Sequence, residues 1–280
     1  MGLFGDAISN LPAVEAELNY LVPMREKPRN YATQPPPGVP GSNATHEAHR
    51  LAICDARPAA PDISLDQQGF ALIRQASKLR NFHDEDEIRG IYYPEAEALV
   101  QDATGADRVF VFDHVVRRHV PGKEDRRGGE RQPVWRVHVD YTARSGPQRV
   151  RDLLPEDAPT LLRGRVQIVN LWRPIRGPVR DAPLAVCDAS SVMPEDLVPS
   201  DLIYRERTGE TYSVTYNPEH RWFYLADMEP EEALLLKCFD SRTDGRARFA
   251  PHSAFKHPSA PAGAPPRESI ELRSLVFHRA

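Results

Sequence analysis

The pattern of apolar and polar residues predicts one long helix followed by a series of strands. Residues 84–100 place apolar side chains at intervals of three to five behind a run of Asp and Glu. Acidic residues in a first turn suit the helix dipole, so this pattern predicts a helix. From residue 108 onward many apolar residues are β-branched or aromatic, which is typical of strands. We expect strands at residues 108–116, 135–141, 165–172, 184–187, 211–216, 221–225, 246–252 and 269–277.

Shorter elements account for other parts of the chain. Residues 146–153 and 229–240 fit two more helices, and the second of these begins with acidic residues. Residues 13–21 fit either a short helix or a strand, and residues 31–48 form a proline-rich connector. Lys237 and Asp240 would then lie near a helix end, where capping or a salt bridge is the expected role.

Several short strands separated by turn signals over about 170 residues favour a jelly-roll barrel. The predicted fold class is therefore mainly β with flanking helices around a double-stranded β-helix (jelly-roll) core. We expect a single domain over residues 1–280. Within it, residues 1–107 form an N-terminal extension and flanking elements, and residues 108–277 form the core.

Composition excludes several functional classes. The formal net charge is −4 and the arginines are scattered among acidic residues, so nothing indicates nucleic acid as a partner. The longest apolar runs are far shorter than the roughly 18 residues of a membrane helix, and the first residues lack the layout of a signal peptide. The three cysteines are widely spaced, which favours reduced thiols and a cytoplasmic location. The oligomeric state stays open.

The segment around His138 and Asp140 carries the most informative chemistry. Residues two apart on a strand point to the same face, so one imidazole and one carboxylate project side by side. Such a pair alone is usually structural, but it also supplies two of the three ligands in a 2-His-1-carboxylate facial triad for non-haem Fe(II). The third ligand should lie well downstream, and His252 ends a later apolar stretch.

A candidate anion-binding pair follows His252. Arg267 opens the last predicted strand, and Ser269 lies two residues further on the same face. An arginine in this setting can bind a carboxylate with two parallel hydrogen bonds, to which a hydroxyl adds a third. Arg273 shares that face in a regular strand, so it is a rival for the role or a substrate contact. An α-keto-acid co-substrate of iron would need such a partner.

Together these segments resemble a known enzyme family. The chain is similar to Fe(II)/2-oxoglutarate-dependent oxygenases. More narrowly, it resembles the family of the cephalosporin 7α-methoxylation hydroxylase component and the fungal gibberellin-desaturase-like enzymes of secondary metabolism. The matching segments are FDHVVRR (residues 112–118), VHVDYT (137–142), NLWRP (170–174), PLAVCD (183–188), KCFDS (237–241), PHSAF (251–255) and RESIELR (267–273).

This resemblance implies a function and a site. His138, Asp140 and His252 would bind Fe(II), and Arg267 with Ser269 would bind the distal carboxylate of 2-oxoglutarate. Dioxygen would complete the reaction, which would oxidise a C–H bond of a small-molecule substrate by hydroxylation or desaturation. The substrate pocket would be walled by loops within residues 119–134, 142–163 and 200–222.

Two other functions remain open at this point. An iron enzyme of the same fold could work without 2-oxoglutarate, and Arg267 with Ser269 would then bind a carboxylate of the substrate. A non-catalytic jelly-roll binding module could hold a structural metal or none. Structural zinc sites are usually closed by four ligands, often cysteines, and no cysteine lies close in sequence to the three candidate ligands.

Overall fold

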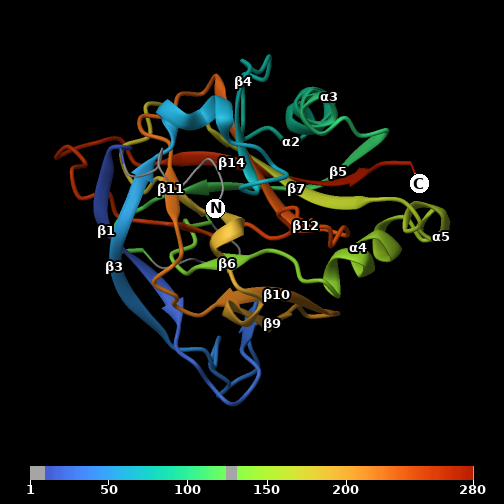
Figure 1. The fold of residues 1–280 in the computed structure, drawn as a ribbon, viewed down its shortest axis with the longest axis horizontal. Coiled ribbons are helices and arrows are strands. Elements are labelled where there is room, and N and C mark those ends of the chain that lie inside the picture. Colours follow the sequence, from blue (N-terminus) through green and yellow to red (C-terminus); the bar gives the residue numbers. More distant parts are fainter. Residues whose placement is uncertain (1–9, 124–130, 280) are drawn as a thin grey trace.

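The computed structural model describes residues 10–123 and 131–279, and it is built mainly from two β-sheets (Figure 1). One sheet has nine strands in the order β1-β3-β11-β8-β13-β6-β10-β9-β2, and the other has five in the order β4-β12-β7-β14-β5. The nine-stranded sheet contains β1 (Ala13–Leu21), β2 (Arg29–Tyr31), β3 (His46–Asp55), β6 (His138–Val139), β8 (Leu184–Cys187), β9 (Leu197–Ile203), β10 (Thr208–Val214), β11 (Trp222–Tyr224) and β13 (His252–Ala254). The five-stranded sheet contains β4 (Phe70–Arg74), β5 (Arg108–Arg118), β7 (Val166–Pro174), β12 (Glu232–Asp240) and β14 (Glu268–Phe277). The predicted jelly-roll class is confirmed.

The five-stranded sheet lies between two apolar layers, since every residue of β7 and β12 is buried. On one face, Leu171 and Leu235 pack with residues of helix α3 (Tyr93–Thr104). On the other face, Trp172 and Leu234 pack with residues of the nine-stranded sheet. Successive residues of a strand point to opposite faces, so one buried strand serves both layers.

The predicted helix at residues 229–240 is wrong, because this segment forms strand β12 between β4 and β7. A central strand that is covered on both faces reads as a continuous apolar run, and such a run does not show the alternation that marks a half-buried strand. Helix-favouring Ala and Leu then suggest the wrong element, because tertiary burial overrides intrinsic propensity.

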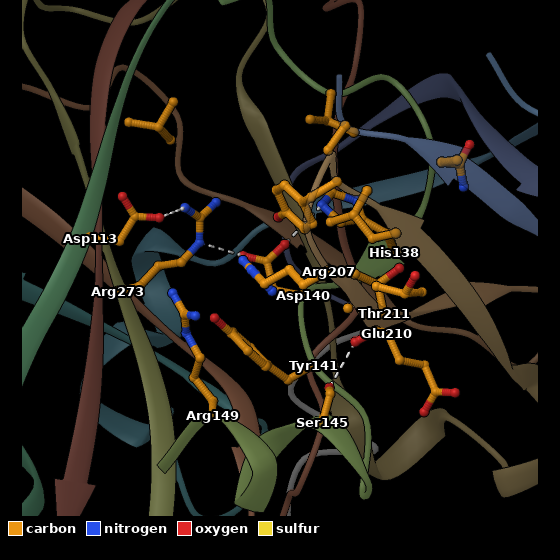
Figure 2. A pocket seen from close by; sticks show the side chains of 18 of the residues that line it. Asp113, His138, Asp140, Tyr141, Ser145, Arg149, Arg207, Glu210, Thr211 and Arg273 are labelled. Carbon is orange, nitrogen blue, oxygen red and sulfur yellow. Dashed lines mark hydrogen bonds and ion pairs between the residues drawn. The ribbon is translucent and has the colours of Figure 1, made fainter. Parts of the chain in front are cut away.

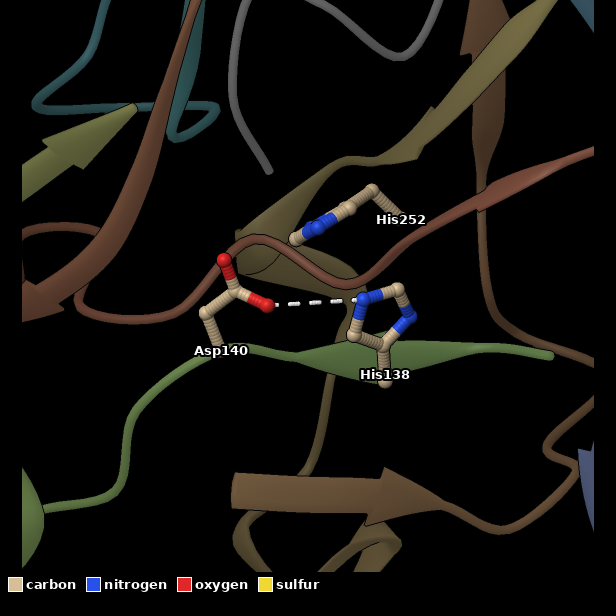
Figure 3. Close-up of side chains that lie close together, drawn as sticks. All are labelled: His138, Asp140 and His252. Atoms are coloured by element: carbon tan, nitrogen blue, oxygen red, sulfur yellow. Dashed lines mark ion pairs between the residues drawn. The ribbon is translucent and has the colours of Figure 1, made fainter. Parts of the chain in front are cut away.

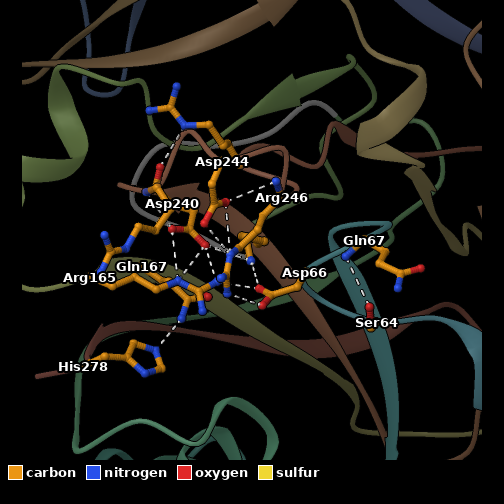
Figure 4. Close-up of polar contacts among 12 residues, drawn as sticks. Ser64, Asp66, Gln67, Arg165, Gln167, Asp240, Asp244, Arg246 and His278 are labelled. Carbon is orange, nitrogen blue, oxygen red and sulfur yellow. Dashed lines mark hydrogen bonds and ion pairs between the residues drawn. The ribbon is translucent and has the colours of Figure 1, made fainter. Parts of the chain in front are cut away.

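Lys237 lies within β12 rather than near a helix end, and its salt-bridge role is confirmed. Its ammonium group is fully buried and contacts Asp66 at 2.6 Å and Asp240 at 2.9 Å. Arg165 contacts the same two carboxylates, and Arg246 binds Asp66 from the outer side (Figure 4). This cluster compensates the charges that the buried end of β12 brings into the interior.

The other predicted elements differ from the structure mainly in their bounds. The predicted helix at residues 84–100 is divided into α2 (Glu85–Glu87), a π-helical turn η2 (Ile88–Tyr92) and α3. The helix at residues 146–153 is α4 (Ser145–Leu153), and residues 13–21 form a strand. Other helical pieces are α5 (Ala158–Leu161), η1 (Arg57–Asp62), η3 (Ala189–Ser191) and η4 (Pro194–Asp196).

Two predicted strands are much shorter than expected. Of residues 135–141 only His138–Val139 pair as β6, and the strand expected at residues 246–252 begins only at its last residue. Both segments carry candidate metal ligands, and irregular backbone on either side of short strands leaves room for a site.

The first 107 residues supply strands to both sheets. Strand β3 pairs with β11 in the nine-stranded sheet, and β4 pairs with β12 in the five-stranded sheet. The single domain and its division at residue 108 stay predictions. Within the described part of the chain, no helix is long and apolar enough to cross a membrane.

Candidate metal centre

The three candidate ligands meet where two short strands of the nine-stranded sheet pair. His252 of β13 stands directly opposite His138 of β6, and the two ring centroids are 4.4 Å apart. Asp140 follows β6 and turns its carboxylate toward the same point (Figure 3). One ligand atom from each residue lies within 4.8 Å of the others. The structure therefore joins the distant histidine to the pair that the sequence singled out.

Both histidines are fixed in the tautomer that metal binding requires. Nδ1 of His138 lies 2.9 Å from the carbonyl oxygen of Arg136, and Nδ1 of His252 lies 3.0 Å from that of Ala250. A carbonyl oxygen only accepts hydrogen bonds, so each Nδ1 carries the proton and donates it. The lone pair is then on Nε2, the atom that each ring can offer to a metal.

Asp140 is oriented through one of its two carboxylate oxygens. Its Oδ2 accepts a hydrogen bond from Asn170 Nδ2 at 2.9 Å and another from Arg273 Nε at 3.0 Å. Its Oδ1 instead lies 3.5 Å from Nε2 of His138 (Figures 2 and 3). One oxygen is therefore committed to the protein and the other is available for a metal.

The charge states of these residues suit a cation. Burial opposes ionisation of Asp140, but the Arg273 guanidinium and the two histidines together outweigh it and hold the pKa of that carboxyl well below its usual range. Burial, with a smaller contribution from His252, lowers the pKa of His138. A neutral imidazole and an ionised carboxylate are the forms in which these groups bind metal. Two nitrogens and one oxygen with an open side form the donor set of non-haem Fe(II) sites.

Two hollows of different size open onto the ligands. The larger has a volume of about 970 Å³ and reaches His138 and Asp140 (Figure 2). Its walls include residues from all three loop regions predicted to form the pocket, although residues 124–130 lie outside the described chain. The smaller lies against all three ligands and is also lined by Trp172 and Arg267.

Arg267 is a buried cation that lines the smaller hollow. Its Nη1 donates to the carbonyl oxygen of Ala182 at 2.8 Å, its Nε donates to Ser269 Oγ at 3.2 Å, and it stacks on the Trp172 ring at 5.1 Å. No carboxylate of the described residues forms an ion pair with it. Burial, reinforced by the nearby charge of Arg117, lowers its pKa to about 9. A buried charge normally has a partner, so this guanidinium fits an anionic ligand in the smaller hollow.

The indole Nε1 of Trp172 also favours a ligand in the smaller hollow. It is buried and has no hydrogen-bond partner in the structure, and its residue lines the smaller hollow. Trp172 packs in the core and also lines the smaller hollow.

Arg273 lies beside the larger hollow, whereas Arg267 lies beside the smaller one. It forms ion pairs at 3.0 Å with both Asp140 and Asp113, and it lines the larger hollow (Figure 2). Sequence reasoning missed Asn170, which donates to the same carboxylate of Asp140 and is completely buried within strand β7. A buried amide in a largely apolar strand is the signal that could have identified this residue, because buried polar groups need partners.

A jelly roll that carries two histidines and a carboxylate beside an open cavity defines the class of non-haem iron oxygenases. A family profile described as "Oxidoreductase/YMDC permease-like domain" matches residues 18–277. The chain is 36% identical to the hydroxylase/desaturase EfuI of Hormonema carpetanum, with 95% of each chain covered. It is 34% identical to the Fe(II)/2-oxoglutarate-dependent dioxygenase NvfI of Aspergillus novofumigatus, covering 88% of this chain and 90% of that one.

The solved structures agree with these sequence matches. The structure of the iron and alpha-ketoglutarate-dependent endoperoxidase NvfI matches with a TM-score of 0.87 at 32% identity, over 96% of this chain and 99% of that one. The chain therefore belongs to the family of these fungal hydroxylase/desaturases and Fe(II)/2-oxoglutarate-dependent dioxygenases.

Proposed function

We propose that this protein is a non-haem Fe(II)/2-oxoglutarate-dependent dioxygenase that oxidises a C–H bond of a small secondary metabolite, by hydroxylation or desaturation. The observation that carries the proposal is the convergence of two imidazole Nε2 atoms and one free carboxylate oxygen at the edge of a large cavity. The names and activities of its relatives support the same reading.

His138, Asp140 and His252 are the residues that would hold the iron. When bound, Fe(II) with 2-oxoglutarate and dioxygen supplies the oxidising power to remove hydrogen from an unactivated C–H bond, and 2-oxoglutarate is converted to succinate and carbon dioxide. The protein holds the donors in fixed orientation and shapes the cavity that aligns the substrate.

Arg267 and Ser269 would bind the distal carboxylate of 2-oxoglutarate. Arg267 lies in the smaller hollow with the three ligands and does not line the larger cavity. This separation favours a co-substrate anion at Arg267 over a substrate carboxylate, and so disfavours the iron enzyme that works without 2-oxoglutarate. Arg273 is a positioning residue, because it acts through Asp140.

Anaerobic titration tests this function. Addition of Fe(II) and then 2-oxoglutarate to the metal-free protein should produce the weak visible charge-transfer band of the chelated co-substrate. His138→Ala and His252→Ala should abolish the band while the circular dichroism spectrum stays unchanged. A wild-type protein that binds both and shows no band would refute the proposal.

Several finer features stay predictions. They are the narrower resemblance to the cephalosporin 7α-methoxylation hydroxylase component, the cytoplasmic location and the absence of a nucleic-acid partner. All three cysteines are free thiols, which supports a reducing compartment.

A further inference from the structure

The large cavity carries more positive than negative side chains. Seven arginines and four Asp or Glu residues line it. An excess of one sign in a concave site attracts ligands of the opposite sign. Arg144 already pairs with Glu210, and Arg273 already pairs with Asp113 and Asp140. Direct binding of an anion requires a cation without such a partner.

Arg149 is a cation of this kind. It lines the cavity from α4, and no residue of the described chain forms an ion pair with it. Its Nε is buried and lacks a hydrogen-bond partner, although the Phe112 ring supports the guanidinium at 4.9 Å. A desolvated donor without an acceptor is costly, so the site gains when a ligand supplies one.

Tyr141 provides a second donor beside it. The Tyr141 hydroxyl makes no hydrogen bond to the described residues. Figure 2 shows this hydroxyl and the Arg149 guanidinium directed toward the same part of the cavity, near Arg273, and the charges of both arginines act on the phenol. Tyr141 directly follows Asp140, so this donor is adjacent in the chain to the proposed metal ligand.

Helix α4 holds Arg149 in a fixed place. Gly146 packs so closely on β12 that a Cβ there would lie 2.6 Å from the Phe239 ring, and Val150 is completely buried. A helix packed at both of these points presents a pre-formed binding group, which reduces the entropy lost on binding.

We propose that Arg149 and the Tyr141 hydroxyl bind a carboxylate of the substrate, so that the molecule oxidised here is a carboxylic acid. This inference rests on the proposed function, because the same cavity reaches His138 and Asp140. One guanidinium and one phenol match the two oxygens of a carboxylate. A phosphate dianion fits less well, because Asp113 and Asp152 line the same cavity and would repel its second charge.

Benzoate is the probe that tests the proposal. Its binding is measured by saturation-transfer NMR on the anaerobic protein loaded with Fe(II) and saturating 2-oxoglutarate, so that Arg267 is already occupied. We expect millimolar affinity for the wild type and at least a tenfold loss in Arg149→Gln, or about 1.4 kcal/mol. Arg149→Lys should fall between the two, because an ammonium keeps the charge without the planar fork. Tyr141→Phe should lower the affinity for benzoate by a smaller factor than Arg149→Gln does.

Arg144→Gln is the matched control, since Arg144 precedes the same helix and is already paired. It should keep wild-type benzoate affinity. The proposal is overturned if the wild type does not bind benzoate, or if Arg149→Gln binds benzoate as well as the wild type does. It is also overturned if Arg144→Gln loses as much benzoate affinity as Arg149→Gln, or if the wild type binds inorganic phosphate more tightly than benzoate. An unaffected Tyr141→Phe would remove the tyrosine from the site.

The same titration on metal-free protein separates this inference from the function on which it rests. In the separate titration with Fe(II) and 2-oxoglutarate, a missing charge-transfer band in the wild type would refute the oxygenase function. Benzoate binding that depends on Arg149 would still identify an acid-binding cavity.

Discussion

Replacement of Arg267 is the sharpest test of how the co-substrate is held. Two of the five guanidinium N–H groups are used by the Ala182 carbonyl and by Ser269, which leaves three donors for a ligand. Arg267→Ala removes a buried charge-assisted pair, and by analogy with interface charge pairs this should cost about 2–5 kcal/mol. The apparent dissociation constant for 2-oxoglutarate should then rise roughly 30- to several-thousand-fold.

The assay is the anaerobic charge-transfer titration with 2-oxoglutarate at saturating Fe(II). Arg267→Lys should restore only part of the affinity, because an ammonium does not reproduce the fork or the stacking on Trp172. Arg273→Gln is the comparison variant. It should weaken Fe(II) more than 2-oxoglutarate, because Arg273 holds the Asp140 carboxylate. A selective 2-oxoglutarate defect in Arg273→Gln, with normal binding in Arg267→Ala, would show that the two roles have been assigned the wrong way round.

Three further substitutions test the support around the site. Asn170→Ala removes a hydrogen bond to Asp140, so Fe(II) should bind about 10–100-fold more weakly in a chelator competition; unchanged affinity would contradict the orienting role. Burial opposes ionisation of Asp66, but Arg165 and Lys237 lower the pKa of this carboxyl. Its contribution to stability is therefore present above the unfolded pKa of about 4 and is lost as the pH falls. In urea titrations at a series of pH values, Asp66→Asn should therefore lose less stability on acidification than the wild type; equal losses would exclude Asp66 as a source of the acid sensitivity. Gly146→Ala places a methyl group against the Phe239 ring and should destabilise the protein by about 1–3 kcal/mol in thermal unfolding, and an unchanged Tm would mean that α4 has room to move.

The sequence was sufficient for those features that depend on local spacing. His138 and Asp140 share a face because they are two residues apart, and the strands with β-branched residues were placed within a few positions. The pairing of β6 with β13 brings His252 to His138. That pairing is a property of sheet topology, and only the order of motifs along the chain indicated it.

The features that were missed depend on tertiary context. Strand β12 looks helical in sequence because burial on both faces removes its alternation. The different roles of Arg267 and Arg273 depend on which carboxylates lie nearby, since Asp113 comes from β5 and Asp140 follows β6. No spacing along the chain predicts such contacts.

The contacts that orient the two histidines have a consequence for how this scaffold could diversify. Each Nδ1 is held by a carbonyl only two residues earlier in its own segment, Arg136 for one ring and Ala250 for the other. These two contacts involve no side chain of α4 or of the β9–β10 region, which line the substrate cavity. Mutations there can change which molecule is accepted without disturbing the histidine donors, so new specificities are reachable by small steps from a working catalyst.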